Sequence, residues 1–372
     1  MSNNSYIVIF PSLFAQNNIK LLMSNVKKIL EIENQKFTKI SRDGDLILVD
    51  ANDPVFASST INLLFGIKQI LIAKQIKNDY KTIVNEITKI GSSLLLKGEK
   101  FYVSVDGKPK GYVTKDVELS ATSSIIENNK KINSKPGTQE RHDKLLFTYI
   151  TKNNAYVNLF SDKGLGGTVN NSQNQKIICG ISDEFSAITC LEAIKQGFEV
   201  KIIIFYSKYS ELVDLVKILC KILPRTLQNK SHIEFYNVPI VFSGNNILYS
   251  EIISKIAIKE KISFISLPIS PLNFPSSIIK KLQTKIFELG LIPFIPLSGI
   301  DEEIFQNAKE IGLEKYLPKI EKILKRKNDQ ASYTKSISKK IINNIHKNKK
   351  IVTVKLGPNM LHDILDSLEI NH

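Results

Sequence analysis

Apolar and polar positions alternate in long blocks along the chain, and the clearest pattern runs over residues 175–206. An apolar run at 176–180 predicts a strand, and apolar residues at helical spacing over 187–195 predict a helix that ends at Gly197. A second apolar run at 200–205 predicts another strand. Strands that are apolar throughout are buried on both faces, which is typical of a parallel sheet covered by helices. We therefore expect a doubly wound α/β domain around this unit.

The blocks after this unit continue the α/β pattern. They predict helices at 210–222, 248–259 and 358–368, and strands at 233–242, 262–267 and 350–356. A rigid proline turn at 268–272 follows one of these strands.

The N-terminal part shows an α+β pattern. Its first elements are a strand at 6–10, a helix at 14–30, a hairpin formed by 37–40 and 45–50, and a helix at 55–65 that ends at Gly66. This βαββα order predicts a small ferredoxin-like unit. The next elements are helices at 79–96 and 120–128, a loop at 129–142, and strands at 101–105, 144–150 and 155–160.

The composition adds a strong positive charge. The chain has 51 Lys and Arg against 36 Asp and Glu, a net charge of +15 at pH 7. Residues 319–355 hold 12 of these basic residues against only Glu321 and Asp329, so 12 minus 2 gives a local excess of +10. Apolar residues at helical spacing give this segment inner faces, which leaves the lysines outside. The excess indicates a polyanionic partner such as RNA, with a merely solvated cationic face as the alternative.

Cysteines and hydrophobic runs limit the other classes of function. Cys179, Cys190 and Cys220 fall inside predicted strands and helices, so we expect buried small residues and no metal site. No apolar run approaches the roughly 20 residues of a membrane span, and the chain does not open on a signal-like segment. We expect a cytoplasmic protein without membrane contact.

The polar turn at 181–186 is where the chain resembles a known family. In a parallel sheet such a turn lies at the carboxyl edge, where N–H groups at a helix start can hold an anion. The tRNA 4-thiouridine synthetases, or tRNA sulfurtransferases, carry Ser-Gly-Gly-x-Asp-Ser at this point as their ATP-binding pyrophosphate loop (PP-loop). Ser186 matches that pattern, whereas Ser182 and Asp183 replace its glycines and Phe185 replaces its aspartate.

The resemblance therefore implies a degenerate ATP loop. Side chains in place of glycines obstruct a polyphosphate, and Asp183 and Glu184 would repel it, although both residues would favour the start of a helix. Ser182 and Ser186 are the remaining candidates for contact with ATP, which the family uses as its cofactor. The family's catalytic cysteine and two arginines fall on Tyr249, Ser250 and Glu251, so the expected nucleophile is absent.

The resemblance covers nearly the whole chain in the family's domain order, without a C-terminal rhodanese domain. It implies a ferredoxin-like domain at 1–76, a THUMP domain that grips the acceptor end of tRNA at 77–168, and a PP-loop-like α/β domain at 169–372. The motifs that also fit are Leu64-Phe65-Gly66-Ile67, the glycine-rich link Gly164-Leu165-Gly166-Gly167, Pro296-Leu297, Asp301, Glu303-Ile304 and Ile311-Gly312.

Basic residues in polar loops of the THUMP-like region and in the basic C-terminal segment are the predicted RNA contacts. Lysine is a point charge suited to phosphates, so we expect shape-led, salt-sensitive binding, while a solvated surface lysine is the alternative at each single position. The predicted RNA-binding residues are Lys108, Lys110, Lys115, Lys130, Lys131, Lys135, Arg141, Lys144, Lys325, Arg326, Lys327, Lys339 and Lys340.

Three readings of function remain open from the sequence. The favoured one is a tRNA-binding protein derived from a 4-thiouridine synthetase, with ATP-dependent thiolation lost or strongly altered because the loop residues and the cysteine are replaced. The second is an active sulfurtransferase that makes 4-thiouridine with a diverged loop. The third is an interaction subunit that does not bind RNA. A protein partner or a homodimer is compatible with each reading.

Overall fold

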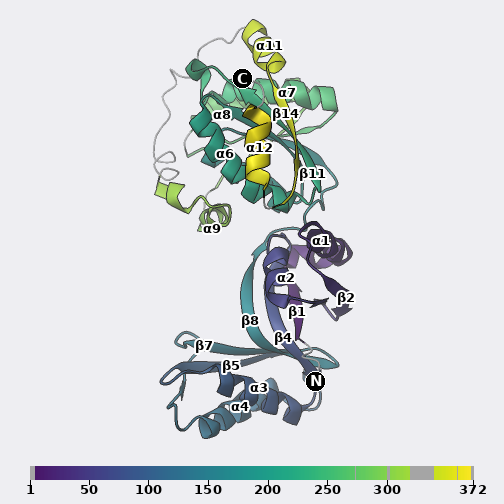
Figure 1. Cartoon of the computed structure of the whole chain (residues 1–372), viewed down its shortest axis with the longest axis vertical. Helices are drawn as coiled ribbons and strands as arrows, with labels where there is room; N and C mark the ends of the chain where they lie inside the picture. The colour runs from purple at the N-terminus through teal and green to yellow at the C-terminus, as the bar shows by residue number, and fades with distance from the viewer. Residues whose placement is uncertain (1–4, 273, 300–301, 319–338, 358, 370–372) are drawn as a thin grey trace. The chain divides into compact units, whose positions relative to one another are not determined.

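A computed structural model describes residues 5–272, 274–299, 302–318, 339–357 and 359–369, and the chain divides into two compact units (Figure 1). The N-terminal unit consists of residues 1–19, 34–62 and 67–164. The C-terminal unit consists of residues 20–33, 63–66 and 165–372.

An eight-stranded mixed sheet forms the N-terminal unit. Its strands are β1 (Ser5–Pro11), β2 (Phe37–Asp43), β3 (Leu46–Ala51), β4 (Ile67–Lys77), β5 (Lys100–Gly107), β6 (Lys135–Pro136), β7 (Lys144–Ile150) and β8 (Asn154–Gly166). They lie in the order β2-β3-β1-β4-β8-β7-β5-β6. Strands β1, β2, β3 and β4 pair antiparallel, whereas β5 runs parallel to β6 and β7. One sheet thus runs through the regions predicted as two N-terminal domains, and the domain boundaries stay a prediction.

The helices of this unit differ in part from the predicted ones. They are η1 (Leu13–Asn18), α2 (Pro54–Ile61), α3 (Tyr80–Leu94) and α4 (Thr114–Asn128). The helix predicted at 14–30 is wrong in its first turns, which form the separate 3₁₀ helix η1 before α1 (Ile19–Ile32). Asn17 and Asn18 end η1, in keeping with the poor helix propensity of asparagine. The sequence reading assigned no strand to β4, and β8 continues through most of the predicted glycine-rich link.

The helix predicted at 55–65 ends early because the residues after it belong to the C-terminal unit. α2 stops at Ile61, and Leu64 and Phe65 are fully buried. Gly66 has φ +88°, and its N–H donates to the carbonyl of Gly166 at 2.7 Å. A Cβ at Gly66 would lie about 3.0 Å from the side chain of Val169, so glycine is required at this close approach.

A six-stranded sheet forms the centre of the C-terminal unit, in the order β13-β12-β9-β10-β11-β14. Its strands are β9 (Lys176–Ile181), β10 (Glu199–Tyr206), β11 (Lys230–Asn237), β12 (Phe264–Ser266), β13 (Ile292–Phe294) and β14 (Lys350–Lys355). All adjacent pairs are parallel except β14, which runs antiparallel to β11. The predicted parallel arrangement of the first two strands is confirmed.

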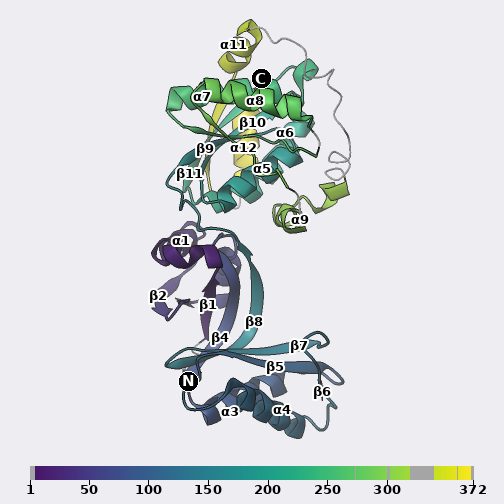
Figure 2. The same ribbon diagram turned by 180° about the vertical axis from the view of Figure 1, so that it is seen from behind.

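Helices cover both faces of this sheet, as Figures 1 and 2 show. They are α5 (Glu184–Lys195), α6 (Tyr209–Ile222), α7 (Asn246–Glu260), α8 (Ser276–Glu288), α9 (Glu302–Glu310), α11 (Lys339–Lys347) and α12 (Met360–Glu369), with short 3₁₀ turns η2 (Leu223–Thr226), η3 (Ile240–Phe242) and η4 (Glu314–Tyr316). Alternate strand residues face different cores: Ile177 and Cys179 join the core under α5 and α6, and Ile178 joins the core under α7 and α8.

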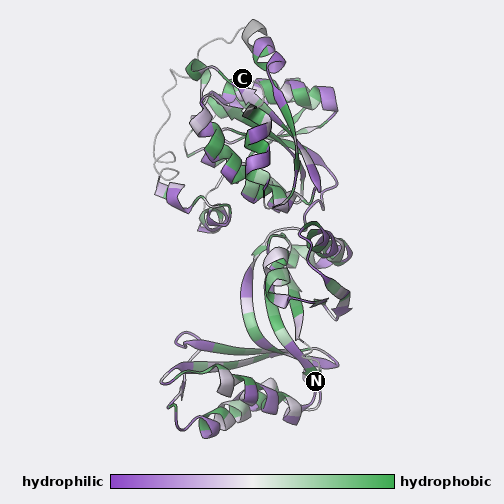
Figure 3. Ribbon diagram, viewed as in Figure 1, coloured by the Kyte–Doolittle hydropathy of each residue, from purple (hydrophilic) through white to green (hydrophobic). Residues whose placement is uncertain are grey.

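The predicted doubly wound α/β class is therefore confirmed. Apolar residues concentrate on the strands between the helical layers, as the hydropathy colouring shows (Figure 3). The sequence reading did not assign α8, and α5 begins three residues before the predicted start at 187. Asp301, one of the residues that fit the family's motifs, lies outside the described residues, as does segment 319–338 of the basic region. Among the described residues, no helix combines the length and the apolar character that crossing a membrane would need.

Candidate functional site

The turn between β9 and α5 is closed by hydrogen bonds within the turn itself. The backbone N–H groups of Ser182 and Asp183 both donate to Ser186 Oγ at 2.9 Å. The Ser186 N–H in turn donates to Asp183 Oδ1 at 2.8 Å, which completes a capping box at the start of α5. Two of the amides available to an anion at this edge are therefore already bonded to a side chain.

The strand end that leads into this turn is tightly packed. The cavity at the carboxyl ends of β9 and β12 has a volume of about 10 Å³, which is room for about one water molecule. Tyr249 occupies the edge, with its ring stacked on Phe205 at 4.4 Å and its hydroxyl accepting the Gly244 N–H at 2.8 Å. A Cβ at Gly180 would lie 2.6 Å from the side chain of Ile253, so the strand also packs tightly against α7.

The residues at the family's catalytic position have structural partners. Tyr249 is buried in this stack, Ser250 Oγ donates to the Ile247 carbonyl at 2.8 Å, and Glu251 forms an ion pair with Lys285. None of the three supplies a thiol.

The chain's cysteines do not replace that thiol. Cys179 and Cys190 are buried, and the hydrogen bond that the Cys190 thiol makes to Cys179, together with burial, raises the pKa of Cys190 well above its usual value. Burial raises the pKa of Cys220 to about 11. Because the thiolate is the reactive form, Cys190 and Cys220 are poor nucleophiles near neutral pH.

These observations test whether the turn fits the ATP that the resemblance implies. A triphosphate would need free amides and space at the sheet edge. The amides of Ser182 and Asp183 are engaged, the Asp183 carboxylate sits in the turn, and the adjoining cavity is smaller than one phosphate group. The residues present do not fit a bound triphosphate.

The eight predicted RNA contacts of the N-terminal unit are all exposed; seven lie near the two ends of strand β5, and Lys115 lies on α4. Lys135 and Lys144 lie at the amino ends of β6 and β7, where they are in register with Lys100 and Phe101 of β5. Lys130, Lys131 and Arg141 lie in the chain around β6, so they belong to the same edge. Lys100 is also exposed here and was missed by sequence reasoning, because it sits in a strand and not in a polar loop.

Lys108 and Lys110 lie at the opposite end of β5, in the loop that leads to α4. They line a pocket of about 490 Å³ together with Lys152, a third exposed lysine that sequence reasoning did not select. The Asp43 carboxylate at the rim is held by Thr151, Asn154 and Tyr156, whose donor atoms lie 2.6–2.9 Å away. The remaining contact, Lys115, pairs with Glu118 at 2.8 Å on α4.

The predicted contacts of the basic C-terminal segment are only partly described. Lys325, Arg326 and Lys327 lie outside the described residues. Lys339 and Lys340 begin helix α11.

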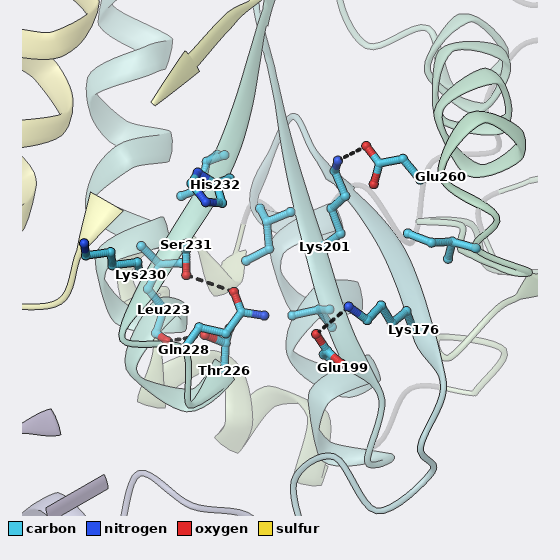
Figure 4. Close-up of a pocket in the computed structure, with 14 residues that line it drawn as sticks. Lys176, Glu199, Lys201, Leu223, Thr226, Gln228, Lys230, Ser231, His232 and Glu260 are labelled. Atoms are coloured by element: carbon cyan, nitrogen blue, oxygen red, sulfur yellow. Dashed lines mark hydrogen bonds and ion pairs between the residues drawn. The ribbon is translucent and has the colours of Figure 1, made fainter. Parts of the chain in front are cut away.

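A second cavity, of about 270 Å³, lies at the amino edge of the parallel sheet (Figure 4). It exists because β10 and β11 pair only from Ile203 and Glu234 onward, so their amino ends diverge. Figure 4 shows Lys176 directed toward Glu199, Lys201 toward Glu260, and Ser231 toward Gln228. Doubly wound folds bind ligands at the carboxyl edge, so this cavity is not at the expected place for a nucleotide.

The charges around this cavity neutralise one another. Lys201 bonds both Glu260 and Glu234, and these bonds outweigh burial and raise its pKa. Burial would raise the pKa of Glu234, but hydrogen bonds from Lys349, Tyr236 and Lys201 lower it to about 2. Both groups are charged near neutral pH, so neither serves as an acid or base, and the cluster is a structural ion-pair network.

The architecture defines the class of the molecule: a mixed-sheet N-terminal unit is followed in the chain by a doubly wound α/β unit. In the second unit, the turn between β9 and α5 caps a helix at the carboxyl edge of the sheet, where such folds commonly bind anions. The comparisons with known proteins show what the chain is similar to. No protein-family model matches the chain. A probable tRNA sulfurtransferase from Methanosarcina acetivorans is 24% identical over 182 residues, which are 48% of this chain and 43% of that protein. The chain thus matches less than half the length of this curated relative.

Two solved structures share the fold. The crystal structure of a 4-thiouridine synthetase–RNA complex with bound ATP has a TM-score of 0.66 and 15% identity, and the match covers 94% of this chain and 100% of that one. The crystal structure of PH1313 from Pyrococcus horikoshii Ot3 has a TM-score of 0.63 and 18% identity, and the match covers 83% of this chain and 100% of that one. These similarities confirm the resemblance to the tRNA 4-thiouridine synthetases that was stated from the sequence, and the two solved structures show a shared fold.

Proposed function

We propose that this protein is a tRNA-binding relative of the tRNA 4-thiouridine synthetases whose ATP-dependent thiolation is lost or strongly altered. The observation that carries the proposal is a contrast between two regions. Cationic side chains are exposed on the N-terminal unit, whereas the turn at the carboxyl edge of the C-terminal unit is bonded to itself. The fold neighbour that binds RNA and ATP supports the relationship.

Binding of RNA is tested first. Fluorescence anisotropy with labelled tRNA should give saturable binding whose affinity falls steeply with salt, because lysines at phosphates release counterions. Each phosphate contact contributes up to about 0.9 to the magnitude of the slope of log K against log salt concentration. The Lys135→Gln, Arg141→Gln, Lys144→Gln variant, which removes three such contacts, should therefore show a slope whose magnitude is smaller by up to about 3.

A matched control removes the same charge elsewhere. Lys28, Lys280 and Lys281 are exposed and lie in the C-terminal unit, and their triple glutamine variant should keep the wild-type slope. Absence of tRNA binding by the wild-type protein at low salt would refute the proposal and favour an interaction subunit that does not bind RNA.

Whether the protein binds ATP is tested at the turn between β9 and α5. In the closed turn, Ser186→Ala removes the acceptor of two amides and half of a capping box, which should destabilise the protein by about 1 kcal/mol. Isothermal titration should then detect no ATP binding in the wild type. Saturable ATP binding that Ser186→Ala abolishes, or 4-thiouridine formed in tRNA with a sulfur donor, would instead establish the active sulfurtransferase.

A further inference from the structure

Helices α7 and α11 form one continuous surface on the C-terminal unit. Ile342 and Ile345 of α11 are buried in the same apolar core as Ile252 and Ile256 of α7. Lys255 Nζ also donates to Asn343 Oδ1 at 3.1 Å, which joins the two helices at their outer side. Both ribbon views place the two helices side by side (Figures 1 and 2). Their outward faces therefore act as a single surface, which we call the α7–α11 face.

Three lysines on this face have no acidic partner among the described residues. Lys255 and Lys259 are exposed one turn apart on α7, and Lys347 is exposed at the end of α11. α11 contains no acidic residue, and Figure 3 colours it largely hydrophilic.

Two carboxylates of α7 and of the neighbouring strand β11 already pair with other lysines. Glu260 pairs with Lys201, and Glu234 pairs with Lys201 and Lys349. The face therefore presents a cationic surface that no ion pair of the described residues compensates.

His346 lies inside this surface and responds to its field. The imidazole approaches the Tyr236 hydroxyl at 3.3 Å, next to the Glu234 carboxylate. Burial is the largest cause that lowers the His346 pKa, and Lys349, Lys259 and Lys255 lower it further, while Glu234 opposes them. The lysines thus impose a positive potential on a group that can report their neutralisation.

We propose that the α7–α11 face, through Lys255, Lys259 and Lys347, binds the phosphate backbone of a nucleic acid. The inference rests on the proposed tRNA binding, and it adds Lys255 and Lys259 of α7, which lie outside the predicted RNA residues and the basic segment. Lysine ammonium groups suit phosphates as point charges. Exposed Asn343 and Asn344 add amide donors, and the described residues of the two helices expose no Phe, Tyr or Trp on which a base could stack. Recognition here is therefore of the backbone and not of sequence.

The test is the Lys255→Gln, Lys259→Gln, Lys347→Gln variant, compared with the Lys28, Lys280 and Lys281 control in tRNA binding across a salt series. The α7–α11 variant should lose about 2 to 3 from the salt slope, whereas the control should lose none. Wild-type slopes in both variants, with tRNA still bound, would overturn this inference and leave the proposed function intact. Failure of the wild-type protein to bind tRNA would refute both.

A second measurement locates the contact. The His346 resonance, assigned by its loss in His346→Gln, should titrate with a higher pKa when tRNA is bound, because phosphates neutralise the surrounding lysines. An unchanged His346 titration in saturating tRNA would overturn the inference. Polyglutamate at equal charge concentration is the comparison. If it displaces tRNA and raises the His346 pKa by the same amount, the inference is also overturned, since the face would then suit an acidic polypeptide equally well.

Discussion

Asn170 is expected to be a main determinant of the stability of the C-terminal unit. Its side chain is fully buried and bonds two backbone groups: Oδ1 accepts the Phe65 N–H at 2.9 Å, and Nδ2 donates to the Arg225 carbonyl at 2.8 Å. Its own carbonyl accepts from Asn25 Nδ2 at 3.0 Å. One residue thus connects three segments that are far apart in sequence, namely α1, residues 63–66 and η2.

The expected cost of Asn170→Ala follows from these bonds. The substitution leaves the Phe65 N–H and the Arg225 carbonyl buried without partners, and each unsatisfied buried group costs about 1–3 kcal/mol. The total of about 2–6 kcal/mol is a large share of the stability of a domain, which is about 5–15 kcal/mol. The melting temperature of the C-terminal unit should fall by roughly 4–24 °C, at about 2–4 °C per kcal/mol.

Chemical and thermal unfolding, followed by circular dichroism, measure this change. The Asn25→Ala variant is the matched control, because it removes only one of the bonds at the same junction and should cost about 1 kcal/mol. The transition of the N-terminal unit should stay in place. If Asn170→Ala changes the free energy of unfolding by less than about 0.5 kcal/mol, the three segments are not held by this side chain and the reasoning is refuted.

Three further predictions follow from buried polar groups. Three side-chain donors outweigh burial and lower the pKa of Asp43, so its contribution to stability holds above its unfolded pKa and is lost as pH falls through the folded value. Asp43→Ala should therefore weaken the N-terminal unit at pH 7, and the difference from wild type should shrink below about pH 4 in an unfolding series. Glu234→Gln should cost about 2–3 kcal/mol at pH 7 by leaving lysines unpaired, and since the Glu234 pKa is lowered from 4.5 to about 2, wild type should lose this advantage progressively as pH falls from about 4.5 to about 2. Thiol labelling of the native protein should reach only Cys220, slowly, and all three cysteines after unfolding, whereas fast labelling of Cys179 or Cys190 would contradict the packed core.

The parts of the fold that the sequence predicts well are those set by local periodicity. The strand, helix and strand over residues 175–206 are confirmed, because continuous apolar runs and helical spacing leave few alternatives. α3 was also predicted nearly to its bounds, since Asp79 caps its first turn and apolar positions recur along it. In these elements the chain's local preference and its tertiary environment agree.

Contacts between distant segments could not be predicted in the same way. The partition of residues 63–66 into the C-terminal unit depends on Asn170, which is 105 positions away from Phe65, and nothing in the local pattern of either residue marks the pair. The divergence of β10 and β11 likewise arises from their register and not from their composition. Such features appear only when the strands are placed next to one another.

The turn at Ser186 shows why a matching residue type does not establish a matching role. In the family pattern, glycines leave backbone amides open to phosphate, and the serine stands beside them. Here Asp183 adopts an extended conformation, with φ −161°, and caps α5, so the turn closes and Ser186 Oγ accepts the amides of Ser182 and Asp183. The retained serine therefore satisfies the donors that the lost glycines would leave free. Identity at one position supports a common origin, whereas the bonds made by that residue are what support or oppose a shared chemistry.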